Sequence, residues 1–289
     1  MANSIAKFKN YIALLDEVYK EASKTAVLDG DASLVRAGAN ANEIIIPKMS
    51  LDGLADYSRN SGYVRGDVTL TNETVAFNYD RGRQFVVDAM DDEETAGIAF
   101  GKLSSEFIRT KVTPEMDAFC FAELTAHAGH TEAGALANNT AIVDAVHAGM
   151  VYQDNLEVTE EGRYLFCTPA VKAALDLQDS YKSRAIIERF ADIIAVPQGR
   201  FYTKIDLKTG GAGQTAGGYA KADDGLNIDF MIVEKSAVIK YPKHTVDKVF
   251  APDEVQDIDG WKFNYRAYGL VDVYENKEDG IYVHTPTNP

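Results

Sequence analysis

The stretch that decides the fold joins a strand-like periodicity directly to a helix-like one. Residues 66–90 read GDVTLTNETVAFNYDRGRQFVVDAM, and residues 91–124 read DDEETAGIAFGKLSSEFIRTKVTPEMDAFCFAEL. In the first part apolar and polar side chains alternate, which predicts a long β-hairpin over Val68–Val87 with a tip at Asn72-Glu73. In the second part apolar side chains recur with helical spacing, which predicts a long helix interrupted once at Pro114. Paired strands joined directly to a long helix have little core of their own, so we interpret this stretch as assembly machinery.

Composition limits the class of protein. The chain has 289 residues, of which 46% are apolar, enough for one large domain or two modest ones. Its 29 basic and 44 acidic residues give a formal net charge of −15. A protein that binds DNA or RNA without sequence preference needs Lys and Arg to displace counterions, so the charge argues against that class.

The two cysteines, Cys120 and Cys167, lie in apolar surroundings, which favours ordinary core thiols over a disulfide framework. No segment reaches the roughly 18 apolar residues of a membrane-spanning helix, and the N-terminus lacks the apolar run of a signal peptide. We therefore expect a soluble protein made in a reducing cytoplasm.

The N-terminal segment carries an apolar stripe with helical spacing. The residues of the stripe are Ile5, Phe8, Ile12, Leu15, Tyr19 and Ala22. Such a stripe fits a helix docked on its own domain. It fits equally an arm that packs on a neighbouring molecule or on an assembly partner.

Two further features have plain structural interpretations. Ile44–Pro47 predicts a short strand closed by the proline, and residues 51–65 predict a loop punctuated by glycines. The acidic run at residues 91–94 has the residue types of a metal site. Carboxylates are also typical of the first turn of a helix, where they meet unpaired N–H groups, and we favour that interpretation.

The second half of the chain first alternates helices and strands and then becomes rich in strands. Helices are predicted over about residues 140–152 and from Pro169, with strands over residues 163–168 and 193–196. The strands predicted in the tail cover residues 230–233, 237–241, 245–250, 261–268, 270–274 and 280–284.

No group of residues forms a convincing catalytic centre. Gly211-x-Gly213-x-x-Ala216 has the spacing of a dinucleotide fingerprint, but no helix is predicted after it to offer N–H groups to a pyrophosphate. A surface loop is favoured there. His127 and His130 lie where the predicted helix ends, and no cysteine or carboxylate pattern completes a zinc set. We therefore expect no enzyme activity, no cofactor and no metal.

A series of short motifs extends over nearly the whole chain. In order, they are Gly53-Leu54-Ala55-Asp56-Tyr57, Gly66-Asp67-Val68-Thr69-Leu70-Thr71, Tyr79-Asp80-Arg81-Gly82-Arg83, Arg109-Thr110-Lys111-Val112-x-Pro114-Glu115, Gly162-Arg163-Tyr164-Leu165-Phe166, Val196-Pro197-x-Gly199-Arg200-Phe201 and Gly280-Ile281-Tyr282-Val283-His284. No single motif decides. In their order and spacing they resemble the major capsid proteins of tailed bacteriophages and prophages, which share the Hong Kong 97-type architecture.

The resemblance implies an α+β fold of the Hong Kong 97 type. Four parts are expected: an N-terminal arm, an extended β-hairpin called the E-loop, a peripheral domain with a long spine helix and a long sheet, and an α/β axial domain. They would cover, respectively, residues 1–48, 49–90, 91–129 with 236–275, and 130–235 with 276–289.

The resemblance also implies a non-enzymatic coat protein of the virion, assembled in the cytoplasm of a bacterial host. Its copies would assemble as pentamers and hexamers into an icosahedral head shell that encloses double-stranded DNA. A portal and a separate scaffolding protein are the expected partners, without a membrane. The net negative charge fits a container whose wall does not hold its polyanionic cargo tightly.

One departure from some relatives is visible in the sequence. In those relatives a lysine of the E-loop forms an isopeptide bond with an asparagine of an adjacent subunit. Between Met49 and Gly101 this chain has arginines but no lysine. Covalent cross-links through the E-loop are therefore not expected.

The expected assembly residues lie on the hairpin and on the arm. Arg81 and Arg83 are the leading candidates, because forked guanidinium groups suit carboxylates across an interface. Solvated arginines at a strand end are the competing interpretation. The remaining candidates are Phe77, Tyr79, Asp88, Ile5, Phe8, Ile12 and Leu15.

Two other functions remain open from the sequence. The same fold would serve an encapsulin-like bacterial compartment that holds a cargo enzyme. An enzyme that binds a nucleotide at residues 210–218 is less favoured, because no helix is predicted after that loop.

Overall fold

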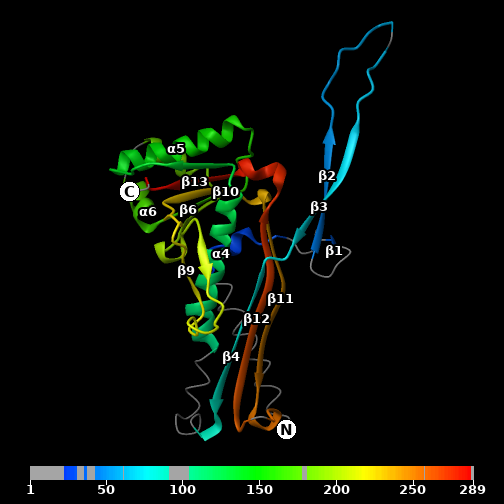
Figure 1. Cartoon of the computed structure of the whole chain (residues 1–289). Coiled ribbons are helices and arrows are strands. Elements are labelled where there is room, and N and C mark those ends of the chain that lie inside the picture. The colour runs from blue at the N-terminus through cyan, green and yellow to red at the C-terminus, as the bar shows by residue number, and fades with distance from the viewer. Residues whose placement is uncertain are drawn as a thin grey trace.

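The structure, a computed structural model, describes most of the chain. The described residues are 23–30, 36–37, 43–60, 62–90, 104–177, 181–256 and 258–287. The predicted arm stripe that contains Ile5, Phe8, Ile12 and Leu15 lies outside them, as does the acidic run at residues 91–94. The described part is elongated, with a compact head, a long sheet beside helix α4, and a ribbon of two strands that projects away from the body (Figure 1).

The long sheet has three antiparallel strands. They are β11 (Val238–Phe250), β12 (Gly260–Val273) and β4 (Tyr79–Asp88), with β12 in the centre. Two pairs of tail strands that the sequence predicts separately are each one continuous strand. The intervening residues stay extended, with only a register shift between Pro242 and His244.

The hairpin predicted over residues 68–87 is wrong. β3 (Val68–Ala76) pairs with β2 (Glu43–Leu51) and β4 pairs with β12, so the two halves of the predicted hairpin belong to different sheets. The link between them does not turn back, because the side-chain amide of Asn78 binds the backbone of Val271. Its Nδ2 donates to the Val271 carbonyl over 2.8 Å, and its Oδ1 accepts from the Val271 N–H over 3.1 Å.

The projecting ribbon consists of β2, β3 and the loop between them, residues 43–76. The loop covers residues 52–67, which confirms the loop predicted around residues 51–65. The strand predicted to end at Pro47 instead continues through it to Leu51. In the described structure β1 (Arg36–Ala37) pairs only with Ile44 and Ile45, so Pro47 lies where β2 is an edge strand, and an edge tolerates a proline.

The helix predicted to break at Pro114 is continuous. Residues 104–107 are α-helical, Ile108–Val112 form a π-helical turn, and α4 follows at Thr113–Ala126. In the wide turn the N–H of Thr113 bonds to the carbonyl of Ile108, and the Thr113 hydroxyl donates to the same oxygen over 3.0 Å. This irregular turn accommodates a proline that cannot donate a backbone hydrogen bond.

The head contains a mixed five-stranded sheet in the order β5-β13-β10-β6-β7. Its elements confirm the helices predicted over residues 140–152 and from Pro169, and the strands predicted over residues 163–168, 193–196, 230–233 and 280–284. The sequence did not predict the strand at residues 130–133 or the helix at residues 181–187. The strands are β5 (His130–Ala133), β6 (Arg163–Cys167), β7 (Asp192–Ala195), β10 (Phe230–Glu234) and β13 (Ile281–Thr285). The helices are α5 (Asn139–Asn155), α6 (Pro169–Leu177) and α7 (Tyr181–Ile187). A separate small hairpin is formed by β8 (Ile205–Leu207) and β9 (Tyr219–Lys221).

Helix α4 lies between the long sheet and the head and is buried on nearly all sides. On one side Phe119 packs on Tyr79 of the long sheet, with ring centroids 5.0 Å apart. On the other, Phe121 packs on Phe166 of the head, with centroids 5.3 Å apart. A helix buried all round holds the head and the sheet as one core, from which the ribbon projects.

Candidate assembly surfaces

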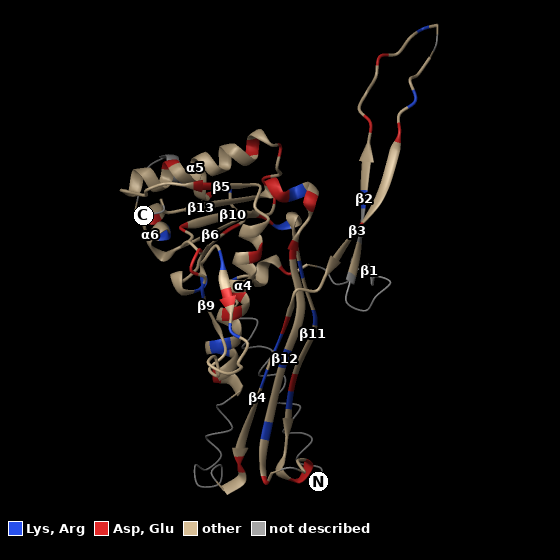
Figure 2. Cartoon of the chain, viewed as in Figure 1, with Lys and Arg blue, Asp and Glu red and all other residues tan. Residues whose placement is uncertain are grey.

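The ribbon has one apolar face that nothing in the described structure covers. Met49 lies opposite Leu70, and Leu51 lies opposite Val68, so the four side chains share one face. Their exposed fractions are 59% for Met49, 64% for Leu51, 66% for Val68 and 64% for Leu70. The opposite face carries polar residues such as Ser50, and the strands bear little charge (Figure 2). A two-stranded ribbon with an uncovered apolar face is marginal alone, so this face calls for a partner surface.

The tip of the ribbon is ordered by its own contacts and is also exposed. The backbone N–H of Asp67 donates to the Asp52 carboxylate over 2.8 Å, which closes the base of the loop. The rings of Tyr57 and Tyr63 pack 4.8 Å apart. Leu54 beside them is fully exposed. The tip therefore presents aromatic and aliphatic groups to solvent as a formed surface.

The root of the ribbon is fixed to the body by a small core. Ile44 and Val75 of the ribbon are buried against Ile239 and Leu270 of the long sheet. Lys48 adds an ion pair with Glu275, Nζ to Oε2 2.5 Å, although its atoms are partly exposed. These contacts set the direction in which the ribbon leaves the body, so its apolar face is presented at a defined angle.

Burial raises the pKa of Glu73 in β3, and the neighbouring Glu275 raises it further. The acidic groups at the root therefore lie close enough to interact. Nothing in their arrangement places a metal ion there: the described residues contain no group of three or more His, Cys, Asp or Glu side chains suited to hold one.

Arg81 and Arg83 of β4 contact the rest of the same subunit. Arg81 donates from Nε to Glu115 of α4 over 2.7 Å and from Nη2 to the carbonyl of Gly218 over 3.2 Å. Arg83 donates from Nη2 to the carbonyl of Thr215 over 2.9 Å. Both arginines thus anchor the loop at residues 208–218, which we call the glycine-rich loop. A contact between copies through these arginines stays a prediction.

The other predicted assembly residues, in β4 and just before it, lie in different environments. Phe77 stacks on Tyr268 at 4.9 Å between centroids, and the ammonium of Lys243 lies 4.6 Å from the centre of the Phe77 ring. Tyr79 is only 4% exposed and belongs to the core. Asp88 is exposed and accepts a hydrogen bond from the N–H of Met90 over 2.9 Å. The structure therefore does not bring these residues together on one surface.

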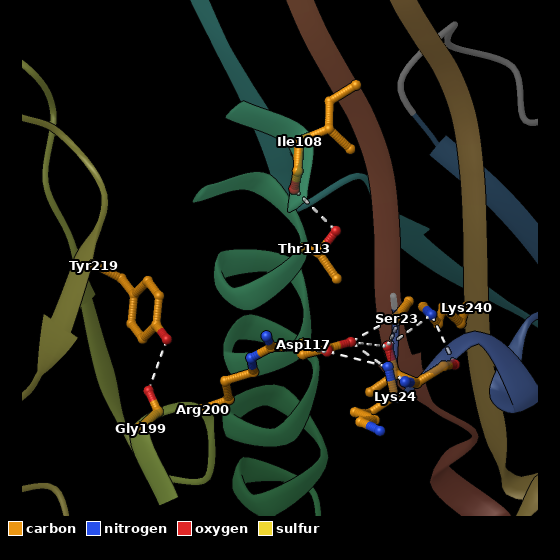
Figure 3. Close-up of polar contacts among 10 residues, drawn as sticks. Ser23, Lys24, Ile108, Thr113, Asp117, Gly199, Arg200, Tyr219 and Lys240 are labelled. Atoms are coloured by element: carbon orange, nitrogen blue, oxygen red, sulfur yellow. Dashed lines mark hydrogen bonds and ion pairs between the residues drawn. The ribbon is translucent and has the colours of Figure 1, made fainter. Parts of the chain in front are cut away.

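A strap formed by Ser23–Asp29 connects the N-terminal segment to α4 through one buried carboxylate (Figure 3). The Asp117 side chain has no exposed surface. Its Oδ1 accepts from the hydroxyls of Ser23 and Thr25, both over 2.9 Å, and from the N–H of Thr25 over 3.3 Å. Its Oδ2 accepts from the N–H of Lys24 and from Nη1 of Arg200, both over 3.1 Å. One carboxylate therefore joins the strap, the helix and the head.

Lys240 of β11 holds the other side of the strap. Its buried ammonium donates to the carbonyl and the hydroxyl of Thr25 over 2.8 and 2.9 Å, and pairs with Asp29 over 2.8 Å. The opposite charges of Asp117 and Lys240 thus compensate each other within one network, in which both residues bind Thr25. The course of the chain that leads to the predicted arm is fixed at this point.

The remaining sequence candidates do not form a catalytic centre. The glycine-rich loop connects the antiparallel strands β8 and β9, so no helix follows it as a dinucleotide fingerprint requires. Burial raises the pKa of both Cys120 and Cys167 to about 12, so neither thiol is ionised near neutral pH. In the described part of the chain no helix is long and apolar enough to cross a membrane.

Sequence reasoning missed the two most informative sites. The apolar face of the ribbon was missed because Met49 and Leu51 follow a proline, where the strand was predicted to end. Their alternation with polar neighbours was the signal that could have revealed a longer strand. Asp117 had a weaker signal, an acidic residue in a helix whose neighbours on both sides are apolar. Its partners come from distant parts of the chain, which no local pattern reveals.

Comparisons with known proteins find similar structures but no matching sequences. No family model matches the chain, and no curated protein matches its sequence. Its structure is similar to one from Mycobacterium phage Che8, with TM-score 0.59 and 14% identity over 85% of each chain. It is also similar to the mature capsid of bacteriophage PhiM1, with TM-score 0.58 and 14% identity over 88% of this chain and 84% of that one.

A third similar structure is a virus-like particle from Pyrococcus furiosus. The TM-score is 0.59 and the identity 8%, over 96% of this chain and 99% of that one. At such identities the similarity establishes a common fold and leaves the function to be argued. The α+β chain accordingly has the fold of bacteriophage capsid proteins, the fold that its sequence resemblance predicts.

Proposed function

We propose that the chain is the major capsid protein of a tailed phage or prophage. In this proposal its copies assemble as pentamers and hexamers into an icosahedral head shell around double-stranded DNA. The observation that supports it most directly is the uncovered apolar face of the ribbon. The fold shared with phage capsid structures supports a shell over other uses of such a surface.

The parts of the chain take roles in this proposal. Residues 1–48 act as the arm and 49–90 as the E-loop, although the pairing of β2 with β3 extends the ribbon back to Glu43. Residues 91–129 with 236–275 act as the peripheral domain, and residues 130–235 with 276–289 as the axial domain. Rings of subunits are head-to-tail contacts, so each copy needs two different complementary edges. The ribbon supplies one of them.

Arg81 and Arg83 retain a role in this proposal. By holding the glycine-rich loop against β4 and α4 they shape a surface that a neighbouring copy meets. The expected partners are other copies of the chain, a portal and a separate scaffolding protein, with no catalytic step and no cofactor. The expected location is the virion.

Electron microscopy of the overexpressed chain at high concentration, with and without a co-expressed scaffolding protein, tests the proposal. Closed shells or capsomers are the expected result. A chain that stays monomeric in every condition, with or without the scaffold, would contradict it.

A second candidate is an encapsulin-like compartment that holds a cargo protein. The near-complete mutual coverage with the Pyrococcus furiosus particle favours keeping this candidate, because the two chains match almost end to end. The genes beside the coding sequence separate the two functions. A portal or terminase gene supports the phage head, and a gene for an oxidase or a ferritin-like protein supports the compartment.

A further inference from the structure

A cavity of about 720 Å³ lies under the glycine-rich loop, inside one subunit. Its walls are β4, the helical segment from Glu106 to Glu115, and the loop itself. Small-molecule sites in proteins typically have volumes of about 300–1,000 Å³. The cavity therefore has room for one small molecule.

Three cationic groups line the cavity without an ion pair among the described residues. They are Arg83, Lys111 and Lys208. Arg83 uses Nη2 for the Thr215 carbonyl, and Gly210 and Gly217 lie beside its Nη1, since an added Cβ atom at either glycine would lie 3.4 Å from that nitrogen.

The two acidic residues of the lining already have partners. Glu115 accepts from Arg81 over 2.7 Å, and Glu106 pairs with Arg109 over 2.6 Å. The uncompensated charge of the lining is therefore positive, in a protein whose net charge is −15.

Aromatic side chains form much of the remaining wall, and one of them has an unsatisfied polar atom. Tyr265 lines the cavity, is only 6% exposed, and its buried hydroxyl has no hydrogen-bond partner within the described structure. Buried hydroxyls normally have a partner, and leaving one unpaired costs about 1–3 kcal/mol. Phe85 and Phe107 lie close to it, with their rings 4.8 Å apart.

The geometry points to a binding site for a small phosphate ester that carries a planar ring. Three cations around one cavity suit a dianionic phosphate better than a single carboxylate. The aromatic wall offers faces for the ring. The phosphate is held by side-chain cations, so the missing helix that excludes a dinucleotide fingerprint does not exclude this site.

Isothermal titration calorimetry of the full-length subunit with AMP, adenosine and inorganic phosphate tests this site. We expect AMP to bind and both fragments to bind at least about tenfold more weakly, because only AMP uses the cations and the aromatic wall together. The double variant Lys111→Ala/Lys208→Ala should weaken AMP binding by about tenfold or more, since it removes two charge-assisted contacts. Its melting temperature checks that it folds.

Lys221→Ala is the matched control, because Lys221 is an exposed lysine of the neighbouring strand β9 that does not line the cavity. It should bind AMP as the wild type does. No binding of AMP, equal binding of adenosine, or equal binding by the double variant would overturn the assignment. If the wild type binds no AMP while the double variant loses shell formation, the cavity belongs to a neighbouring copy instead. Subunit titration does not depend on shell formation, so failure here leaves the proposed function standing.

Discussion

At the scale of single residues, Asp117 is the residue on which the structure depends most. Its carboxylate receives five hydrogen bonds, from the strap and from Arg200. Asp117→Ala leaves these donors without their acceptor, and should lower the free energy of unfolding by about 3 kcal/mol or more. Denaturant titration measures this loss. Asp206→Ala, at an exposed position of β8, is the control and should change stability little. Equal stability of the two variants would contradict the role given to Asp117.

Asp154 should make the stability of the head depend on pH. Burial alone would raise the pKa of Asp154, but hydrogen bonds from Arg189 and Arg163 outweigh it and lower the pKa below its ordinary value of 3.8. A carboxyl whose pKa is lower in the folded state contributes stability above its unfolded pKa, and that contribution is lost as the pH falls through the folded pKa.

We therefore expect the wild type to lose stability below about pH 4 and Asp154→Asn to lose less over the same range. At neutral pH the variant should be less stable by about 2 kcal/mol, because the Arg163 side chain is 98% buried and loses a charged partner. Unfolding free energies measured from neutral to acidic pH give both values. Parallel curves for the two proteins would refute the assignment.

Unlike the two aspartate substitutions, a substitution at Tyr265 should not lower the free energy of unfolding. Its buried hydroxyl has no partner in the described structure. Tyr265→Phe should therefore leave the free energy of unfolding of the unliganded subunit unchanged or raise it by up to about 1 kcal/mol. Denaturant titration measures this too. A loss of more than about 1 kcal/mol would show that the hydroxyl is satisfied in solution.

At the scale of elements, the ribbon is the testable feature. The variant with Met49→Ser, Leu51→Thr, Val68→Thr and Leu70→Thr makes its apolar face polar. Because all four side chains are mostly exposed in the subunit, the free energy of unfolding should change by no more than about 2 kcal/mol in total. Assembly should be lost, which sedimentation velocity measures. Thr69→Ser/Thr71→Ser, on the opposite face, is the control and should assemble normally. Assembly of the fourfold variant would remove the ribbon face from the interface.

The elements also show what the sequence can and cannot predict. Periodicity identified the strands around Val68 and Phe85 correctly and assigned them to each other wrongly, because β3 pairs with the strand before it and β4 pairs with β12, which is distant in sequence. Pairing depends on Asn78 and Val271, which are 193 residues apart. The break predicted at Pro114 failed for a similar reason: the π-helical turn before it lies in a helix packed on both sides, where tertiary contacts outweigh local preference.

The candidate site was predictable only in outline. The resemblance of ordered motifs predicted the fold, which the structural similarity confirms. It did not predict where the assembly residues lie: Tyr79 is in the core, and Arg81 and Arg83 contact the glycine-rich loop of their own subunit. Side-chain environments of this kind depend on contacts between distant segments, and a single sequence does not contain them.

At the scale of the whole molecule, the shell should be held together without covalent bonds through the segment between Met49 and Gly101. The chain has no lysine between Met49 and Gly101, so an isopeptide bond cannot form from this segment. Assembled particles boiled in detergent should run as monomers in gel electrophoresis. A ladder of covalent multimers would show cross-linking from another part of the chain.

The central claim is that the apolar face of the ribbon is buried against another copy. The variant Leu70→Cys tests it directly, because Cys120 and Cys167 are fully buried and do not compete for a thiol reagent. The rate of maleimide labelling is measured on the isolated subunit and on the assembled particle. We expect labelling to be slower in the particle by about tenfold or more. Equal rates in both states would contradict the claim.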